Sequence, residues 1–552
     1  MSTGPGRALY PEERAEGDAP AAGARGPKLT DTVDVLADRT GRVGPLSYQV
    51  PPEMVIRRGD AVKVPFGKRE AYGIVLGAGD PGKATRSLQE VYGKRVTAAE
   101  LDFATRVARE HFCQLSTIAA RLAPRDGKGA PAIDAGSVAL NTARAVTGLA
   151  AIEATQRRRL LICAPLVDQT LVAAQEAARI AERGQVLILC PSVTVARATL
   201  AHFTSGASRL DPAATPGSWK GFAQGSVQVG VGTRTAALYS AEQLAGIIVV
   251  DEDHPGHREQ AQPYTNARDL AISRSATFGI DLVLITSCAS TRALAGSVKA
   301  TAIGGRLQWP GVAVVNTRNE DPTRDLPESV LRVPRGRDAL ILVDSAPVYV
   351  CQRCSKLRRE TNDGDSPTPC LRCGEPGLRQ INWDAERARL SVPGFSPVTL
   401  EQLRPGSGRC VLLPAFDEAL NQAGFEAERW AWHLLICAAR AAGEGGTVIV
   451  VTRDRNHPAL ADLQARSLID QARRSWAQAK QDRLPPFSLW VRVRCGTERP
   501  PATSGLPGRV LGPRKIGTDW ELVIQATTQQ RSAVERAVER LRRRGKVRIE
   551  LL

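Results

Sequence analysis

The chain has 552 residues, enough for several domains, and 43% of them are apolar. Its 74 Lys and Arg residues outnumber its 57 Asp and Glu residues, which gives a formal net charge of +17. This excess favours a polyanionic partner such as nucleic acid, although a protein from an arginine-rich proteome would show it too. No apolar run reaches membrane-spanning length and no charged start leads into an apolar segment. We therefore expect a cytoplasmic, nucleoid-associated protein with no membrane partner.

The first 150 residues divide into a tail, a small domain and a linker. Residues 1–28 are rich in Gly, Pro and Ala, so we expect a disordered tail. Residues 29–125 contain short β-type runs, which predict a small barrel or sandwich, and then one amphipathic helix. Residues 126–150 are rich in Gly and Ala and are expected to be a linker. The β-type runs are Thr32–Leu36, Ala61–Pro65 and Tyr72–Leu76, and the expected helix is Ala98–Leu122.

Residues 151–345 alternate apolar runs with helical segments, a pattern typical of a parallel sheet with helices on both faces. The expected strands are Leu160–Cys163, Gln185–Leu189, Val227–Val231, Ile247–Val250 and Leu282–Ile285, and one expected helix is Leu171–Ile180. A shorter mixed segment occupies residues 381–458, and residues 459–552 combine strands with an amphipathic helix. The sequence therefore predicts an α/β multidomain protein with a small N-terminal β domain and a C-terminal α+β domain.

Two cysteine pairs lie in residues 346–380, which we interpret as a zinc-binding insertion. Cys351 and Cys354 form one C-x2-C pair, and Cys370 and Cys373 form another after a polar gap. Four thiolates at this spacing suit one tetrahedral zinc ion, and they leave no open position for catalysis. We therefore expect a structural or DNA-positioning zinc site, with a redox dithiol or chance pairing as the alternatives.

The segment after Cys163 lies where an α/β ATPase has its phosphate-binding loop. Such a loop needs glycines for its tight turns, and a lysine and a threonine for the phosphates and the metal ion. Leu166 cannot supply a tight turn, and Gln169 stands where the lysine charge is needed. Asp168 would repel phosphate, and of the expected residues only Thr170 remains. The sequence therefore predicts a broken phosphate loop.

An apolar run followed by acidic residues is retained at Ile247–His254. In a working ATPase, Asp251 of this turn would hold Mg²⁺ and Glu252 would polarise the attacking water. Without a phosphate loop, we interpret these residues as a surviving structural turn. We accordingly expect neither ATP nor Mg²⁺ as a cofactor.

Several short motifs together resemble the bacterial PriA family of replication-restart helicases, and they occur in the family's order. They are Val64–Lys68 (VPFGK), Gly232–Ala236 (GTRTA), Gly246–His254 with its acidic box, Tyr264–Ala271 (YTNARDLA) and Pro485–Ser488 (PPFS). The resemblance extends from about residue 31 to residue 552. It implies RecA-like helicase lobes at residues 151–345 and 381–458, the zinc-binding insertion between them, and a C-terminal DNA-binding domain at residues 459–552.

The chain departs from the family where ATP chemistry is carried out. The glycine-rich loop of the family aligns with Cys163–Thr170 and has lost its glycines and its lysine. The family's arginine motif aligns with Ile436–Gly443, where one arginine is kept and the second is replaced by glycine. The second lobe is shortened, and four of the family's eight zinc cysteines are missing, so we expect one zinc ion. The resemblance thus implies a degenerate helicase without a catalytic residue, whose remnants are Thr170, Asp251, Glu252 and Arg440.

The family binds the 3′ end of a nascent strand in its small β domain. The corresponding positions here are Leu46, Ser47, Gly67 and Arg86, and Lys63 and Lys68 flank the same loop. Glycine allows the backbone to approach a sugar, and arginine can hold a phosphate. Ser47 stands where the family has an aspartate that contacts the terminal hydroxyl, so the resemblance alone does not predict 3′-end selectivity. The alternative is a solvated pair of basic strands.

Taken together, these features predict a primosome component without its own ATPase or helicase activity. It would recognise abandoned or stalled forks, hold forked or branched DNA and help reload the replicative helicase. The resemblance implies single-strand DNA-binding protein, the replicative helicase and its loader as partners. Two alternatives remain open: an active ATP-dependent 3′-5′ helicase with an altered nucleotide site, and a generic zinc-ribbon DNA-binding protein.

Overall fold

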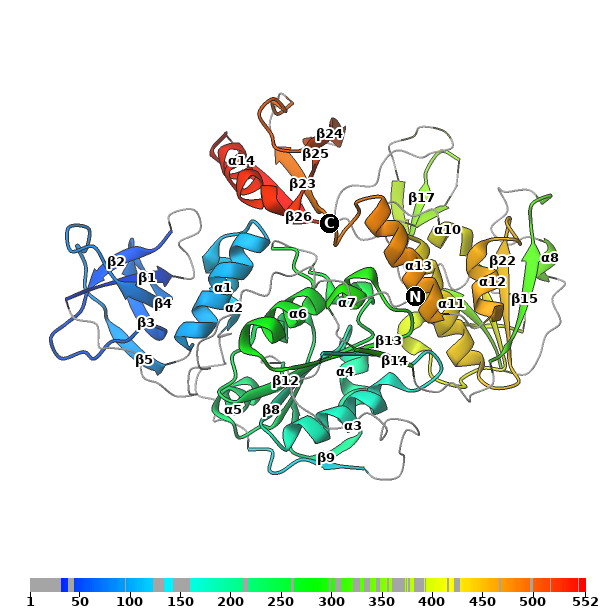
Figure 1. Ribbon diagram of the computed structural model, residues 1–552, viewed down its shortest axis with the longest axis horizontal. Coiled ribbons are helices and arrows are strands. Elements are labelled where there is room, and N and C mark those ends of the chain that lie inside the picture. Colours follow the sequence, from blue (N-terminus) through cyan, green and yellow to red (C-terminus); the bar gives the residue numbers. More distant parts are fainter. Residues whose placement is uncertain are drawn as a thin grey trace, which may run out of the picture.

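The protein is described here from a computed structural model, in which four further units are arranged around a domain with a central parallel sheet (Figure 1). The described residues are 31–37, 44–94, 96–122, 134–141, 159–211, 217–259, 263–296, 299–302, 309–320, 328–331, 338–343, 348–354, 357–359, 373, 375, 378–381, 392, 394–414, 416–420, 427–465, 468–496, 500–516, 518–544 and 546–552. The expected tail at residues 1–28 lies outside them, and so does most of the expected linker. Within the described residues, no helix is both long enough and apolar enough to cross a membrane.

The N-terminal domain is an antiparallel sheet of five strands, in the order β2-β1-β4-β3-β5. The strands are β1 (Thr32–Ala37), β2 (Leu46–Gln49), β3 (Asp60–Phe66), β4 (Arg69–Ala78) and β5 (Glu90–Lys94). Alternate residues such as Val33, Val35 and Val62 are fully buried, as expected when one face of a strand packs on a core. Gly67 starts the two-residue turn between β3 and β4 with φ +60°, a conformation that glycine adopts without strain.

Two helices follow where the sequence pattern predicted one. They are α1 (Ala98–Glu110) and α2 (Leu115–Leu122). The break falls at Phe112, whose φ of +51° cannot continue a right-handed helix. The Phe112 side chain is buried in the hydrophobic core of the C-terminal domain. This tertiary contact overrides the helical periodicity, so the prediction of a single helix was wrong.

The central sheet has seven parallel strands in the order β10-β11-β8-β12-β13-β7-β14. They are β7 (Arg159–Cys163), β8 (Gln185–Leu189), β10 (Ala207–Arg209), β11 (Val229–Gly232), β12 (Leu244–Val250), β13 (Asp281–Thr286) and β14 (Lys299–Ala302). A short pair, β6 (Ala139–Leu140) and β9 (Phe203–Ser205), lies beside it. The expected parallel sheet is confirmed, and we call this unit lobe 1.

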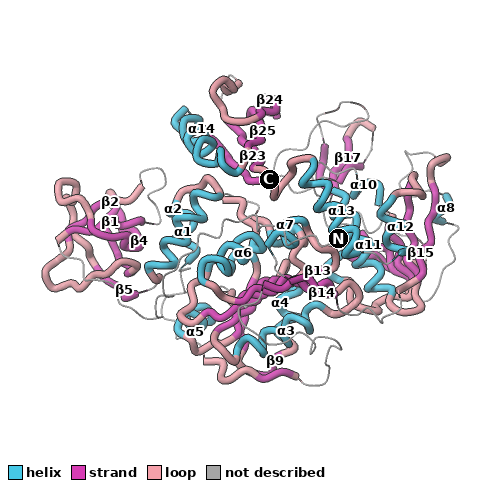
Figure 2. The backbone as a smooth tube through the Cα atoms, in the orientation of Figure 1, coloured by secondary structure: helices cyan, strands magenta, loops and turns pink. Residues whose placement is uncertain are grey.

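Helices cover both faces of the lobe 1 sheet (Figure 2). Helices α3 (Gln169–Ala181) and α4 (Val193–Leu200) contribute to the core on one face. Helices α5 (Ser218–Gln224), α6 (Ala267–Phe278) and α7 (Thr291–Gly296) contribute to the core on the other face, together with α1 and α2. The N-terminal helices are therefore part of the lobe 1 core.

A second parallel sheet, here called lobe 2, has the strand order β15-β22-β21-β16-β20. Its strands are β15 (Gly311–Asn316), β16 (Ala339–Val343), β20 (Ser396–Thr399), β21 (Cys410–Leu413) and β22 (Thr447–Thr452). Its helices include α8 (Glu328–Leu331), α10 (Phe416–Leu420), α11 (Ala427–Ala442) and α12 (Pro458–Ala465). Because β15 and β16 pair with β22 and β21, lobe 2 begins upstream of the expected boundary at residue 345. The half-exposed edge strand β15 lacks the continuous burial that marks the strands of lobe 1.

Two smaller units complete the fold. Strands β17 (Val348–Cys351), β18 (Leu357–Arg359) and β19 (Leu378–Ile381) form an antiparallel sheet at the cysteines. After α13 (Leu468–Gln481), the C-terminal domain has the strand order β24-β25-β23-β26, and α14 (Arg531–Arg544) packs on one face of this sheet. Its strands are β23 (Leu489–Gly496), β24 (Arg509–Ile516), β25 (Asp519–Ala526) and β26 (Lys546–Leu551).

Candidate functional site

The segment that the sequence predicts to be a broken phosphate loop lies between β7 and α3. Asp168 is the N-cap of α3, and its Oδ1 accepts hydrogen bonds from the Thr170 backbone N–H at 3.0 Å and from Thr170 Oγ1 at 2.6 Å. In a phosphate-binding loop, backbone N–H groups at this position point at the ligand. Here the Asp168 carboxylate accepts a hydrogen bond from one of these N–H groups, that of Thr170, and places a negative charge at the helix end.

The neighbouring side chains of this loop fill the space between the lobes. Gln169 is buried and its Nε2 donates a hydrogen bond to Ser287 Oγ at 2.8 Å, so it is held against the end of β13. Leu166 packs on the hydrophobic core of lobe 2, and Cys288 belongs to that same core. Apolar contact thus joins the two lobes at this loop.

Glu252 is fully buried, and its carboxylate is bound by Ser290 and Arg268. It accepts hydrogen bonds from the Ser290 backbone N–H at 2.9 Å, from Ser290 Oγ at 2.8 Å and from Arg268 Nη1 at 3.2 Å. Burial raises the pKa of the Glu252 carboxyl, and Arg268 opposes that shift. Its contacts tie the end of β12 to α6 and to the loop after β13, as a structural turn would.

His433 of α11 in lobe 2 lies between two carboxylates at the end of β12. Its Nδ1 is 3.4 Å from Asp253 Oδ2, and its Nε2 is 3.6 Å from Asp251 Oδ2. Burial disfavours protonation of His433, but Cys437, Asp251 and Asp253 outweigh burial and hold the pKa of the imidazole well above its usual value. Trp430 stacks on the His433 ring with a centroid distance of 5.1 Å. His433 of lobe 2 thus lies against Asp251 and Asp253 of lobe 1, a contact between the lobes that no sequence motif indicated.

A ligand atom from each of Asp251, His254 and His433 lies within 4.8 Å of the others, a spacing that a cation could bridge. However, His254 Nδ1 already accepts a hydrogen bond from the Gly256 N–H at 2.9 Å. Arg440 is electrostatically coupled to Asp251, and its Nη2 contacts Cys437 Sγ at 3.4 Å. Because Arg440 and His433 both lie near the aspartates and His254 Nδ1 is already engaged, we interpret this group as a polar cluster between the lobes.

Three of the four predicted zinc ligands come together beside β17. The Sγ atoms of Cys351, Cys354 and Cys373 lie within 4.8 Å of one another, and Cys370 lies outside the described residues. The Cys351 and Cys373 sulfurs are 3.5 Å apart, far longer than a disulfide bond and close to the ~3.8 Å between two thiolates on one zinc. The Cys354 backbone N–H also points at Cys351 Sγ, at 3.5 Å. These residues fit a metal ion with thiolate ligands.

The predicted DNA-binding residues gather around β2 and the β3–β4 turn. Arg86 Nη1 donates to the Gly67 carbonyl at 2.8 Å, which places the guanidinium against that turn. Leu46 packs partly on the core of the domain, and Ser47 Oγ donates to a carboxylate on the neighbouring strand, that of Asp34. The Lys63 ammonium is paired with Glu70, whose Oε2 lies 2.7 Å from Lys63 Nζ. The exposed Lys68 follows Gly67 in the β3–β4 turn.

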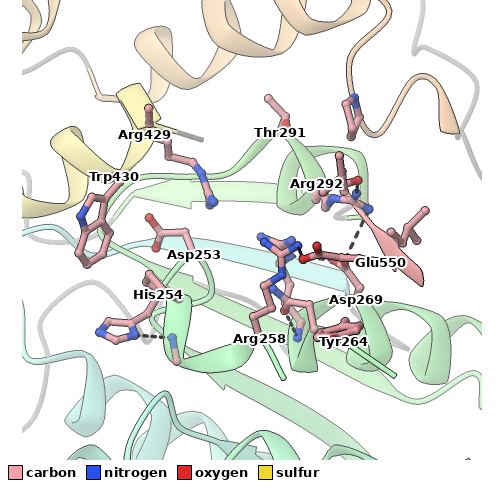
Figure 3. Close-up of a pocket in the computed structure, with 18 of the residues that line it drawn as sticks. Asp253, His254, Arg258, Tyr264, Asp269, Thr291, Arg292, Arg429, Trp430 and Glu550 are labelled. Atoms are coloured by element: carbon pink, nitrogen blue, oxygen red, sulfur yellow. Dashed lines mark hydrogen bonds and ion pairs between the residues drawn. The ribbon is translucent and has the colours of Figure 1, made fainter. Parts of the chain in front are cut away.

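A cavity of about 1210 Å³ lies where lobe 1, lobe 2 and the C-terminal domain meet. Ten of its lining residues are arginines and five are acidic. Figure 3 shows Arg258, Arg292 and Arg429 on different elements around this space, with the Trp430 ring at one side. Arg492 and Arg494 of β23, in the C-terminal sheet, also line this cavity. These two alternate with buried Val491 and Val493 along β23, a pattern that the sequence could have shown.

The N-terminal geometry agrees with a comparison against known families. Residues 34–124 match the PriA 3′DNA-binding domain, 3′BD. All six predicted DNA-binding residues lie within this 3′BD match, which covers the antiparallel sheet and both following helices. The chain is thus similar over this segment to a domain that binds a DNA 3′ end.

Comparison with solved structures finds nucleic-acid-bound proteins of low identity. RecG bound to a three-way DNA junction is 13% identical, with a TM-score of 0.31, over 59% of this chain and 44% of RecG. The Mycobacterium smegmatis helicase Lhr bound to ssDNA and AMP-PNP is 14% identical, with a TM-score of 0.33, over 58% of this chain and 46% of Lhr. The chain thus spans less than half the length of either protein.

Proposed function

We propose that this protein is a DNA-binding component of replication restart that recognises stalled or abandoned forks without hydrolysing ATP. The 3′BD match at residues 34–124 supports binding to a DNA end. The excess of basic residues and the arginine-lined cavity support contact with a polyanion. In this proposal the 3′BD holds the nascent strand and the cavity accommodates a single strand of the fork.

The observation that carries the absence of ATP hydrolysis is the capping of α3 by Asp168. A nucleotide phosphate would have to displace this carboxylate and to separate Leu166 from the core of lobe 2. It would also need a cation in place of Gln169, whose amide is held by Ser287. In this proposal the lobes form a rigid scaffold, and other proteins open the fork.

The proposed partners follow from the same role. A scaffold at a fork would meet single-strand DNA-binding protein on the exposed strand, and it would hand the DNA to the replicative helicase and its loader. We further propose that the cysteines beside β17 bind one zinc ion, with Cys370 as the fourth ligand of Cys351, Cys354 and Cys373.

The test combines ATP hydrolysis with DNA binding by the purified, zinc-replete protein. We expect no ATP turnover above a heat-killed control with saturating forked DNA and Mg²⁺. We also expect tighter binding to forks than to plain duplex at matched salt. Turnover abolished by Asp251→Ala and by Glu252→Ala would instead establish an altered but active helicase. Equal affinity for forks and duplex would leave only a generic DNA-binding protein.

A further inference from the structure

A carboxylate on the wall of the cavity lies between two arginines that belong to different domains. Glu550 of β26 is directly opposite Arg492 of β23 in the antiparallel register, and its Oε2 accepts a hydrogen bond from Arg492 Nη1 at 2.8 Å. Its Oε1 accepts another from Nη2 of Arg258, which follows β12 in lobe 1. All three residues line the cavity, and Figure 3 shows Arg258 and Glu550 side by side in this space. Lobe 1 and the C-terminal domain thus share one negative charge at this point.

Glu550 is an exception on its face of the C-terminal sheet. Val491 and Ile549 are buried in the core of the domain, so the residues that alternate with them on β23 and β26 point to the opposite face, toward the cavity. Among the described residues, the C-terminal domain adds one acidic side chain to the cavity lining, that of Glu550, and several arginines. These arginines are Arg492, Arg494, Arg514 and Arg548. A face that otherwise suits a polyanion therefore carries a single carboxylate.

The two arginines are held in place by groups other than Glu550. Arg492 Nε lies 3.7 Å from Oε2 of Glu521, which is almost fully buried. The backbone of Arg258 forms an isolated antiparallel bridge with Asn266, and its N–H donates to the Pro255 carbonyl at 2.9 Å. The positive charge at this point therefore does not depend on the presence of the Glu550 carboxylate.

The position of Glu550 is one that a phosphate can take. The Arg258 side chain is 38% exposed, so a ligand in the cavity can reach the ion pair. A phosphodiester carries one negative charge, as Glu550 does, and its two free oxygens accept hydrogen bonds from guanidinium groups as a carboxylate does. An ion pair that solvent reaches contributes little to stability, so displacing Glu550 costs little.

We propose that Arg258 and Arg492 form a subsite for one phosphodiester of single-stranded DNA, and that Glu550 occupies this subsite as an internal competitor until a strand enters the cavity. This inference rests on the proposed function, in which the cavity accommodates a single strand of the fork. The two arginines bind the phosphate, and Glu550 determines which anions are admitted.

The tethered carboxylate makes the subsite selective for a strand. Glu550 is on the strand next to that of Arg492, so its effective concentration at the subsite far exceeds that of a free anion. A free phosphate has only this one contact with which to displace it. A strand that is also bound by other arginines of the lining, such as Arg494 and Arg548, presents its next phosphate at a high effective concentration too. The subsite therefore accepts a strand and excludes single phosphates.

The test measures binding of single-stranded DNA by fluorescence anisotropy, with and without millimolar inorganic phosphate at constant ionic strength. Phosphate should leave the affinity of the unmodified protein unchanged. Glu550→Gln should bind single-stranded DNA roughly tenfold more tightly, because no carboxylate has to be displaced from its charge-assisted hydrogen bonds. In this variant inorganic phosphate should lower the affinity for DNA, because the subsite is open to a free anion.

Three further variants separate the subsite from a general effect of charge. Glu428→Gln removes the same charge from the cavity lining, at an exposed position on α11, and should change the affinity by less than about twofold. Arg258→Gln should weaken binding, and the double variant with Arg258→Gln and Glu550→Gln should lose the gain of Glu550→Gln, because the two residues act at one subsite. Arg258→Gln leaves β26 unchanged, so it tests the subsite even if Glu550→Gln does not fold. Thermal unfolding of each variant shows whether the fold is intact.

The outcomes distinguish this inference from the function on which it rests. If the unmodified protein binds neither forked nor single-stranded DNA, the proposed function fails. If it binds DNA but Glu550→Gln gains no more affinity than Glu428→Gln, or if the double variant keeps the gain, the assignment of the subsite is wrong while DNA binding stands. Competition of inorganic phosphate with DNA in the unmodified protein would show that Glu550 does not exclude single anions.

Discussion

The Asp168 carboxylate caps α3 by accepting the Thr170 backbone N–H at 3.0 Å, so the helix end that would hold a phosphate is occupied by the chain's own negative charge. The cap is local, because both residues belong to the same turn. The cap therefore depends on the geometry of this turn alone. Its consequences can be measured separately for stability and for nucleotide binding.

Replacing this cap should cost stability without restoring ATP binding. We expect Asp168→Ala to lower the free energy of unfolding by about 1 kcal/mol, as for loss of an N-cap side chain. ATP should still fail to bind, because Gln169 and Leu166 continue to occupy the site. Thermal unfolding and calorimetric titration with ATP and Mg²⁺ check the two parts. Saturable ATP binding by Asp168→Ala would show that the carboxylate alone had closed the site.

The His433 contact between the lobes should make stability depend on pH. The pKa of His433 is raised in the folded protein, so its contribution is fully present below its unfolded pKa of about 6.5 and is lost as pH rises through the folded pKa. Burial disfavours ionisation of Asp253, but His433 outweighs it and holds the pKa of that carboxyl below its usual range. The contribution of Asp253 is thus present above an unfolded pKa of about 3.9 and is lost as pH falls through the lower folded value.

We expect His433→Gln to destabilise the protein most between about pH 4 and pH 6.5, by roughly 3 kcal/mol, because it leaves Asp253 buried without its partner. The difference in melting temperature from the unmodified protein should shrink as pH rises further. Differential scanning calorimetry from pH 4 to pH 9 measures this. His457→Gln, in lobe 2 but away from the two aspartates, is the control. A difference that grew with rising pH would contradict a protonated His433.

Metal analysis tests the cysteine cluster. We expect one zinc ion per chain, and its loss in the variant with Cys351→Ser and Cys354→Ser, because two of the thiolate ligands are gone. Chelation should then have no further effect on that variant, while it lowers the melting temperature of the unmodified protein. The double variant with Cys410→Ser and Cys495→Ser changes two cysteines outside the cluster and should keep its zinc. Absence of metal in the unmodified protein would refute the assignment.

The cavity can be tested through Arg494, which faces Arg548 across the β23–β26 register and lines the space. Arg494→Gln should weaken binding of single-stranded DNA by a similar factor for every sequence. It should also lower the slope of log affinity against log salt by about one, as for one lost phosphate contact. Fluorescence anisotropy at several salt concentrations measures both. Arg179→Gln, which changes an arginine of α3 that does not line the cavity, should leave the slope unchanged. A base-specific loss would instead point to contact with base edges.

The five expected strands of lobe 1 were predictable because each is a continuous apolar run, and strands such as β8 and β13 are buried on both faces. The helix break at Phe112 was not, because its cause is burial in a core more than 370 residues further along the chain, in strands such as β23. The edge strand β15 and the inner strand β16 were also missed, because they belong to a sheet whose other strands come later in the sequence. The hydrophobic periodicity of a segment indicates which of its residues are buried, but it does not indicate which distant element they pack against.

The functional residues also fall into those that the local sequence predicts and those that only tertiary contacts bring together. The sequence by itself predicts a broken phosphate loop, because Leu166, Asp168 and Gln169 stand within one turn where such a loop needs glycines and a lysine. The sequence also predicts the metal site, because its cysteines belong to two short local pairs. Only the tertiary structure decided that His433 meets Asp253 and that Glu550 meets Arg258. Both contacts depend on how separate elements are packed or registered, and a one-residue change of register would turn Glu550 to the other face of its sheet.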